Sequence, residues 1–214
     1  MRIRISTSGP ADGRNGRVKL PLRATGRTSG PVRPVFRLDD LDQRLQAGQI
    51  DIALRPYLGS RPQPTGQKWC PFYQDPLYYL PRSTTPHVDR VGGPVQLETV
   101  LHETYVLTPD VCGLAGATRE LFAACGAEMK TYPGQALSYQ VMQDWADLGI
   151  GAAMLPLSKL SSENRSKAQS IITPDSEAAV IRHLAIWRAD VDHAPHVKAL
   201  HEHFNNTVPK LVPV

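Results

Sequence analysis

Residues 138–156, "SYQVMQDWADLGIGAAMLP", contain the change of pattern that decides the fold. Val141, Trp145 and Leu148 recur at helical spacing, so the segment 138–149 predicts a helix that turns these three side chains inward. The following stretch "IGAAMLP", residues 150–156, is a short, almost continuous apolar run, which is typical of a strand buried inside a parallel sheet. A helix that leads directly into a buried strand indicates an α/β protein.

The same alternation of strands and helices continues on both sides of this segment. "DDLDQRLQAG", residues 39–48, predicts a helix in which Leu41 and Leu45 share a face and Gly48 ends the helix. Near the end of the chain, Val197, Leu200 and Phe204 predict an amphipathic helix after an apolar strand. Further elements are expected as strands over 50–54, 76–80, 104–108 and 183–189, and as a helix over 118–126. This order predicts mostly parallel sheets covered by helices.

Length and composition limit the class of protein. A chain of 214 residues with 41% hydrophobic content can bury a core, as one large domain or as two lobes. The three cysteines are scattered and form no CxxC pair, which favours a reducing compartment. The sequence holds no signal-peptide pattern and no apolar run that could cross a membrane, so we expect a cytoplasmic protein without a membrane partner.

The net charge of +4 is unevenly distributed along the chain. Residues 1–37 hold nine Lys or Arg against the single acid Asp12, so the basic character belongs to the amino-terminal stretch. Such an asymmetry can mark contact with a nucleic acid or an anionic ligand. A solvated loop is the other interpretation, because residues 9–31 are rich in Gly and Pro and contain no aromatic residue for base stacking.

Four stretches in a fixed order carry a resemblance to a known family. They are "LDDLDQRLQAGQIDIALRP", "PFYQDPLYYLPR", "ALSYQVMQDWADLGIGAAMLPLSKL" and "HLAIWRADVDHAPHVKALHEHF". Together they resemble the effector-binding domain of LysR-type transcriptional regulators. The resemblance implies an α/β fold of the type II periplasmic-binding-protein class, with two α/β lobes and a ligand cleft between them. The implied lobes are 1–76 with 165–214 and 81–160, joined by crossover segments at 77–80 and 161–164.

The resemblance leaves two functions open. One is the effector-binding module of a LysR-type regulator, which would hold a small anionic or polar aromatic metabolite and contact DNA only through a winged helix-turn-helix that this sequence lacks. The other is a stand-alone descendant that binds a biosynthetic metabolite or acts on it as an isomerase, cyclase or lyase. The second is favoured by the missing helix-turn-helix and by stretch 9–31, whose prolines and glycines oppose the helix that the family has there and that commonly contributes to its dimers and its ligand cleft. The four stretches that are intact elsewhere favour the first, which is the function that we expect. A homodimer is a further possibility.

Within the implied fold, the ligand should lie beyond the carboxyl ends of the strands. Hydroxyl groups and the backbone N–H groups of helix starts suit a carboxylate or a similar anion, and Arg55 could serve as its countercharge. The candidate ligand-binding residues of the first lobe are Ser6, Thr7, Ser8, Arg55 and Tyr57. Those of the second lobe are Thr108, Cys112, Gly113, Tyr132 and Gln135.

Cys112 is also the candidate catalytic residue. A thiol close to a helix start can have a lowered pKa and act as a nucleophile, although a half-buried structural thiol has the same sequence pattern. The four histidines between 193 and 203 could recruit a metal, but their spacing against the apolar stripe of the last helix places most of them on a solvated face. We therefore expect neither a metal nor a cofactor.

Overall fold

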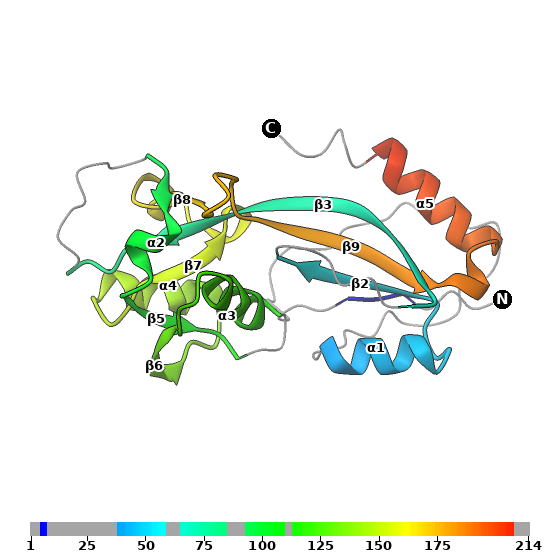
Figure 1. The fold of residues 1–214 in the computed structure, drawn as a ribbon, viewed down its shortest axis with the longest axis horizontal. Coiled ribbons are helices and arrows are strands. Elements are labelled where there is room, and N and C mark those ends of the chain that lie inside the picture. Colours follow the sequence, from blue (N-terminus) through cyan, green and yellow to red (C-terminus); the bar gives the residue numbers. More distant parts are fainter. Residues whose placement is uncertain (1–4, 8–37, 59–64, 85–92, 110–112, 208–214) are drawn as a thin grey trace. The chain divides into compact units, whose positions relative to one another are not determined.

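The computed structural model describes residues 5–7, 38–58, 65–84, 93–109 and 113–207 of the chain (Figure 1). These residues form an α/β structure that divides into two compact units. Unit 1 consists of residues 1–55, 62–73 and 183–214, and unit 2 consists of residues 56–61 and 74–182. The boundary passes through two long strands, between Tyr73 and Gln74 and between Arg182 and His183.

Unit 1 is built on strands from distant parts of the sequence. Its elements are β1 (Ile5–Thr7), α1 (Leu38–Gln46), β2 (Ile52–Tyr57), the first part of β3 (Gln67–Leu80), the last part of β9 (Val180–Arg188) and α5 (Pro195–Thr207), with a short 3-10 helix at Ala189–Val191. The strands are ordered β1-β2-β9-β3, and β1 runs parallel to β2 with Ser6 opposite Ala53. Trp187 and Cys70 lie in the core of this unit, and their strands therefore meet there.

Two helices of unit 1 follow the pattern that the sequence predicts. In α1, Leu41 and Leu45 are fully buried, and Gly48 follows in a left-handed conformation at φ 65°, which glycine adopts without strain. In α5, which begins at Pro195, the three apolar side chains Val197, Leu200 and Phe204 are all at most 4% exposed. Proline is favoured at a first helical position because its missing N–H has no acceptor there. Both predicted helices are confirmed.

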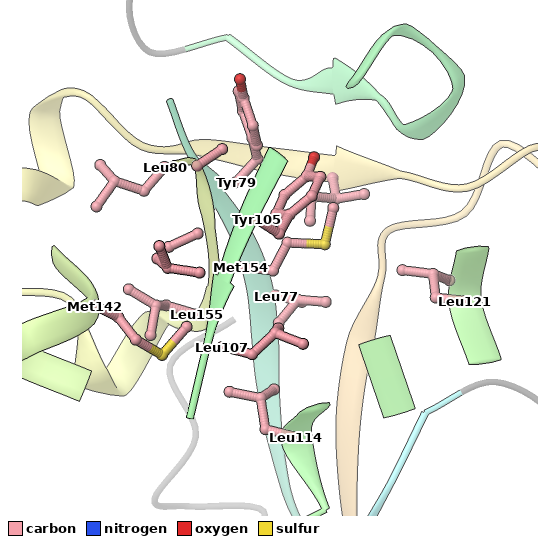
Figure 2. Packing of buried hydrophobic residues seen from close by; sticks show 14 of the residues in the cluster. Leu77, Tyr79, Leu80, Tyr105, Leu107, Leu114, Leu121, Met142, Met154 and Leu155 are labelled. Atoms are coloured by element: carbon pink, nitrogen blue, oxygen red, sulfur yellow. The ribbon is translucent and has the colours of Figure 1, made fainter. Parts of the chain in front are cut away.

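Unit 2 contains the larger core. Its elements are the rest of β3, β4 (Val95–Gln96), α2 (Leu97–Val100), β5 (Thr104–Leu107), α3 (Leu114–Ala124), β6 (Lys130–Gln135), α4 (Tyr139–Asp147), β7 (Ala153–Pro156), β8 (Gln169–Ile172) and the start of β9, with short 3-10 helices at Leu157–Lys159 and Asn164–Ser166. Strand β3 pairs antiparallel with β7 and with β8, whereas β5 and β6 form a separate parallel pair. Figure 2 shows how side chains from β3, β5, β7, α3 and α4 meet in this core.

Helix α4 lies where the sequence predicts it but turns a different face inward. Its buried side chains are Tyr139, Met142, Gln143 and Ala146, while Leu148 is 72% exposed. Val141 and Trp145 are half-buried and pack against the core, so the predicted inward face is wrong for Leu148 and leaves out the most deeply buried residues, Met142 and Ala146. The reason is that two apolar faces compete on this short helix, and the small Ala146 permits closer contact with the sheet than Trp145 does.

The boundaries of the two compact units differ from the predicted lobe limits. The prediction places crossovers at 77–80 and 161–164 and assigns 165–214 to the first lobe. Residues 165–182 instead group with unit 2. The physical reason is strand pairing, because β8 pairs with β3 and β4, and Leu77 donates its backbone N–H to Ala179 at 2.8 Å.

Candidate effector site

The carboxyl ends of β5 and β6 lie side by side in unit 2. Leu107, the last residue of β5, is opposite Gln135, the last residue of β6, and the backbone N–H of Ala136 donates to the Leu107 carbonyl at 2.9 Å. Thr108 directly follows β5, so it stands at this shared strand edge. In a parallel pair, this edge is where the sequence analysis expects a ligand.

The hydroxyl group of Thr108 distinguishes this residue from an ordinary core threonine. The residue is 8% exposed, and its Oγ1 is buried with no hydrogen-bond partner among the described residues. A buried hydroxyl without a partner costs about 1–3 kcal/mol relative to one that is paired. Such an orphaned group at a strand edge is available to a ligand that brings its own donor or acceptor.

Helix α3 begins at Leu114, six residues after Thr108. Gly113 precedes it with a φ of 77°, in the left-handed region that glycine tolerates, and has no side chain that could cap the helix. The first backbone hydrogen bond of the helix runs from Ala117 N–H to the Gly113 carbonyl at 2.9 Å. The start of an eleven-residue helix carries partial positive charge, and this favours an anion at the same end of the unit as Thr108.

Tyr132 and Gln135 both lie on β6, in the stretch where its pairing with β5 shifts register. Tyr132 is 40% exposed and its ring meets the edge of Trp145 of α4 at 5.5 Å between ring centres. Gly134 lies against both rings, since an added Cβ there would come within 2.9 Å of Tyr132. Tyr132 is therefore held on the α4 side, and Gln135 is exposed at the strand edge beside Thr108.

Arg55 is already paired within unit 1. Its Nη1 donates to both carboxylate oxygens of Asp42, at 2.7 and 2.6 Å, so strand β2 and helix α1 are joined by this ion pair. If Arg55 acts as the predicted countercharge for an anion, it does so while paired with Asp42, whose negative charge offsets its own. Sequence analysis missed this partner, because Asp42 is one of three aspartates in "DDLD" and lies thirteen residues away.

The remaining predicted residues divide between the units or fall outside the description. Ser6 and Thr7 lie in β1, opposite Ala53 and Leu54 of β2, with only their backbone described. Tyr57 is the half-buried last residue of β2. Ser8 and Cys112 lie outside the described residues. Thr108 and Gln135 are thus the predicted residues that the pairing of β5 with β6 brings to one strand edge, and Gly113 precedes helix α3.

The two described cysteines are poor nucleophiles. Burial raises the pKa of the Cys70 thiol to about 11. Burial, and then the carboxylates of Glu98 and Asp175, raise the pKa of Cys125. Both thiols stay protonated at neutral pH, and the thiolate is the reactive form.

The histidines near the end of the chain lie in different surroundings. His193 and His201 are exposed, and His196 lies 3.9 Å from Asp51 through its Nε2. Over the described ranges, no group of three or more His, Cys, Asp or Glu residues could hold a metal ion. The same residues include no helix that is long and apolar enough to cross a membrane.

A buried polar network at the 161–164 segment escaped the sequence analysis. Gln143 of α4 is 1% exposed, donates to the Lys159 carbonyl at 3.1 Å and accepts from the Ser161 N–H at 2.9 Å. Asn164, also buried, donates to the Gln143 and Asp147 side chains. This network fixes the segment after β7 to α4. The signal in the sequence is a glutamine between Met142 and Ala146, on the face that is otherwise apolar.

Comparisons with known proteins bear on the family and the fold. The family model described as the LysR substrate binding domain matches residues 35–209. The comparison with curated proteins finds no match.

Several solved structures share the fold. The CcmR regulatory domain of Synechocystis, in complex with 2-PG, has a TM-score of 0.66 at 14% identity, covering 97% of each chain. The effector-binding domain of QuiR in complex with shikimate has a TM-score of 0.67 at 14% identity, covering 98% of each chain. An OxyR mutant from Porphyromonas gingivalis has a TM-score of 0.69 at 14% identity, covering all of this chain and 94% of that one.

Proposed function

This chain belongs to the LysR substrate-binding domain family, the effector-binding part of LysR-type transcriptional regulators, and from that premise we propose that it senses a small anionic or polar aromatic metabolite. The proposed ligand contacts the strand edge where β5 and β6 end. The single observation that carries this proposal is the buried hydroxyl of Thr108, which has no partner among the residues that the structure describes. A ligand oxygen placed there would satisfy it and would lie near the start of α3.

The chemistry of this edge favours an anion over a cation. It offers a hydroxyl at Thr108, a side-chain amide at Gln135 and a helix start after Gly113, all of which can donate hydrogen bonds. No carboxylate is among these three residues. We further propose that Ser6, Thr7, Ser8 and the Arg55–Asp42 pair of unit 1 are candidates for ligand contact, and that the protein acts in the cytoplasm.

Two structures of similar fold support a small ligand. The CcmR domain was solved with 2-PG and the QuiR domain with shikimate.

CbnR, which resembles this chain with a TM-score of 0.64 at 15% identity over 97% of this chain and 70% of its own, was solved full-length on its target DNA. We infer that sequence-specific DNA contact requires a helix-turn-helix outside the matched residues, so residues 1–214 alone should bind DNA only weakly and lose that binding as salt is added.

The test begins with a panel of small carboxylates, phosphates and hydroxylated aromatic acids in a thermal-shift assay, because a ligand of the folded state raises the melting temperature. Compounds that bind are then measured by calorimetry on the wild type, Thr108→Val and Thr118→Val. Thr118 is the matched control, since its hydroxyl is buried but already donates to the Leu114 carbonyl at 2.7 Å.

We expect Thr108→Val to weaken binding about tenfold, equivalent to about 1.4 kcal/mol, and Thr118→Val to bind as the wild type does. Equal affinity of all three proteins would refute the assignment of the site. Mass spectrometry of the recovered compound separates the sensor from the alternative catalyst, because a sensor returns its ligand unchanged.

A further inference from the structure

One face of helix α4 holds the segment that connects β7 to β8. We define the strap as residues 159–168, which lie between these two strands. Tyr139, Gln143 and Asp147 are four residues apart on α4, so their side chains lie along one face of the helix. The Lys159 ammonium lies 5.8 Å from the centre of the Tyr139 ring, and Gln143 donates to the Lys159 carbonyl at 3.1 Å. The strap is thus held against α4 by polar groups.

Both ends of the strap are anchored on strand β3. Before the strap, Ser158 donates its backbone N–H and its hydroxyl to the carboxylate of Asp75, at 3.1 and 2.5 Å, and Asp75 is only 3% exposed. After the strap, Gln169 begins β8 and pairs with Tyr79. These anchors lie outside the strap, so departure of the strap from α4 does not require β3 to separate from its neighbours.

The interior of the strap contains one polar residue in an otherwise apolar row. Its buried residues are Leu160, Asn164 and Ala168, each four positions from the next and at most 5% exposed. Six of its ten residues are exposed, so little apolar area holds the strap closed. A single buried polar residue in such a row fixes how two segments align, at a cost in stability.

Asn164 makes only part of the hydrogen bonds that its side chain can form. Its Nδ2 donates to Gln143 Oε1 at 3.4 Å and to Asp147 Oδ2 at 3.3 Å. Its Oδ1 is buried and has no hydrogen-bond partner among the described residues. A buried polar network that is incomplete stabilises the closed state less than a complete one does. The central contact of the strap is therefore specific in register but weak.

The outer contact of the strap is an ion pair at the surface. Lys167 Nζ lies 2.8 Å from Asp147 Oδ1, and the two side chains are 45% and 39% exposed. Exposed pairs of this kind contribute little to stability and are screened by salt. An incomplete inner network and a screened outer pair thus close the strap, while its two ends stay on β3.

We propose that the strap opens and closes as one unit while α4 and the strands of unit 2 stay folded, and that Asn164 is the positioning residue that sets its closed register. Local opening occurs where few apolar contacts and many exposed hydrogen bonds hold a segment. Helix α4 stays in place without the strap, because Met142 on another face of the helix is fully buried in the core of the unit (Figure 2). Salt favours the open strap, so this device responds to ionic strength.

The experiment measures amide hydrogen exchange of the whole chain, resolved by residue with NMR. The amides of Ser161, Arg165 and Ala168 report on the strap, since all three donate hydrogen bonds in its closed form. The amides of Val106 and Ala152 report on the core, where they join β5 to the segment that enters β7. We expect the strap amides to share one level of protection, at least about tenfold below that of the core amides.

Asn164→Asp tests the positioning role, because it keeps the shape of the side chain and replaces the donating Nδ2 by an oxygen. That oxygen faces the acceptors of Gln143 and Asp147, so strap protection should fall at least about tenfold while core protection stays unchanged. Adding Asp147→Asn supplies a donor for the new carboxylate and should restore most of the protection. The matched control is Ser162→Asp, which adds the same charge at an exposed position of the strap and should change nothing.

The response to ionic strength is measured on the same amides. Raising salt from about 50 to about 500 mM should lower strap protection by up to about threefold in the wild type and leave it unchanged in Lys167→Met, which lacks the ion pair. Strap protection that does not change with salt in the wild type would overturn this response.

Two results would overturn the rest of the proposal. Equal protection of strap and core amides in the wild type would show that the strap opens only when the whole unit unfolds. An equal loss of protection in strap and core in Asn164→Asp, or no recovery when Asp147→Asn is added, would show that Asn164 does not position the strap against α4.

Discussion

Replacing Thr108 with Val should make the ligand-free protein more stable while it weakens the proposed site. Valine has nearly the shape of threonine and is also branched at Cβ, so the change in side-chain entropy is small. What changes is the hydroxyl, which is buried and has no partner in the described part of the chain. An apolar group in the same place removes the cost of that unpaired hydroxyl.

The magnitude follows from the burial of this one group. Leaving a polar group buried and unpaired costs about 1–3 kcal/mol, and we take the lower end because a threonine hydroxyl is a small group. A gain of about 1 kcal/mol in the free energy of unfolding corresponds to a rise of about 2–4 °C in the melting temperature for a protein of this size. Thr118→Val should do the opposite and lower stability by about 1 kcal/mol, because it removes a hydrogen bond of 2.7 Å to the Leu114 carbonyl.

The assay is urea unfolding of the wild type and the two valine variants without ligand, followed by thermal unfolding with a bound compound. Without ligand, we expect the change in the free energy of unfolding to have opposite signs in the two variants. With ligand, we expect the melting temperature to rise less in Thr108→Val than in Thr118→Val. If Thr108→Val is as destabilising as Thr118→Val, then the Thr108 hydroxyl has a partner in solution and the reasoning for the site fails.

Three further predictions concern the cores and the ion pair. Met142→Ala should lower the free energy of unfolding by about 2–5 kcal/mol, because Met142 is fully buried. Leu148→Ala should lower it by less than about 0.5 kcal/mol, because Leu148 is 72% exposed. Equal effects of the two variants in urea unfolding would contradict the observed orientation of α4. Because the pKa of Cys70 is raised to about 11, the unfolded chain loses this proton first, so stability should fall between about pH 9 and pH 11 by at most about 1.4 kcal/mol per pH unit. Unfolding measured across that range should show a flatter slope in Cys70→Ala. Arg55→Met should lower the free energy of unfolding by less than about 1 kcal/mol in the same assay, because the side chain of its partner Asp42 is 39% exposed and water solvates the remaining carboxylate. A loss above about 3 kcal/mol would show that the Asp42 carboxylate is left as a buried, unpaired charge.

Hydrophobic periodicity predicted several helices of this protein correctly. The buried pair Leu41 and Leu45 and the trio of α5 lie three or four residues apart, so one stripe marks one inward face. Helix α4 has two such stripes, and local spacing does not say which one is buried. The sheet and the neighbouring loops decide which stripe is buried. Ala146 has a smaller side chain than Trp145, and Gln143 forms hydrogen bonds with the segment after β7.

Part of the candidate site could also be predicted from the sequence. Strand ends can be located from short apolar runs, and this places Thr108 and Gln135 near two ends. That these ends are neighbours depends on the parallel pairing of β5 with β6, which joins residues almost thirty positions apart. The pairing of Arg55 with Asp42 is likewise a tertiary contact, and it changes the charge that Arg55 can offer to a ligand.

The sequence by itself determined the α/β class, the position of most elements and the family resemblance, because these depend on the local order of apolar and polar residues. Only the tertiary structure decided the inward face of α4, the grouping of residues 165–182 with unit 2 and the lack of a partner for the Thr108 hydroxyl among the residues described. Each of these depends on contacts between segments far apart in the chain. Such contacts are selected by strand pairing and by the volume available in the core, and a local pattern does not contain that information.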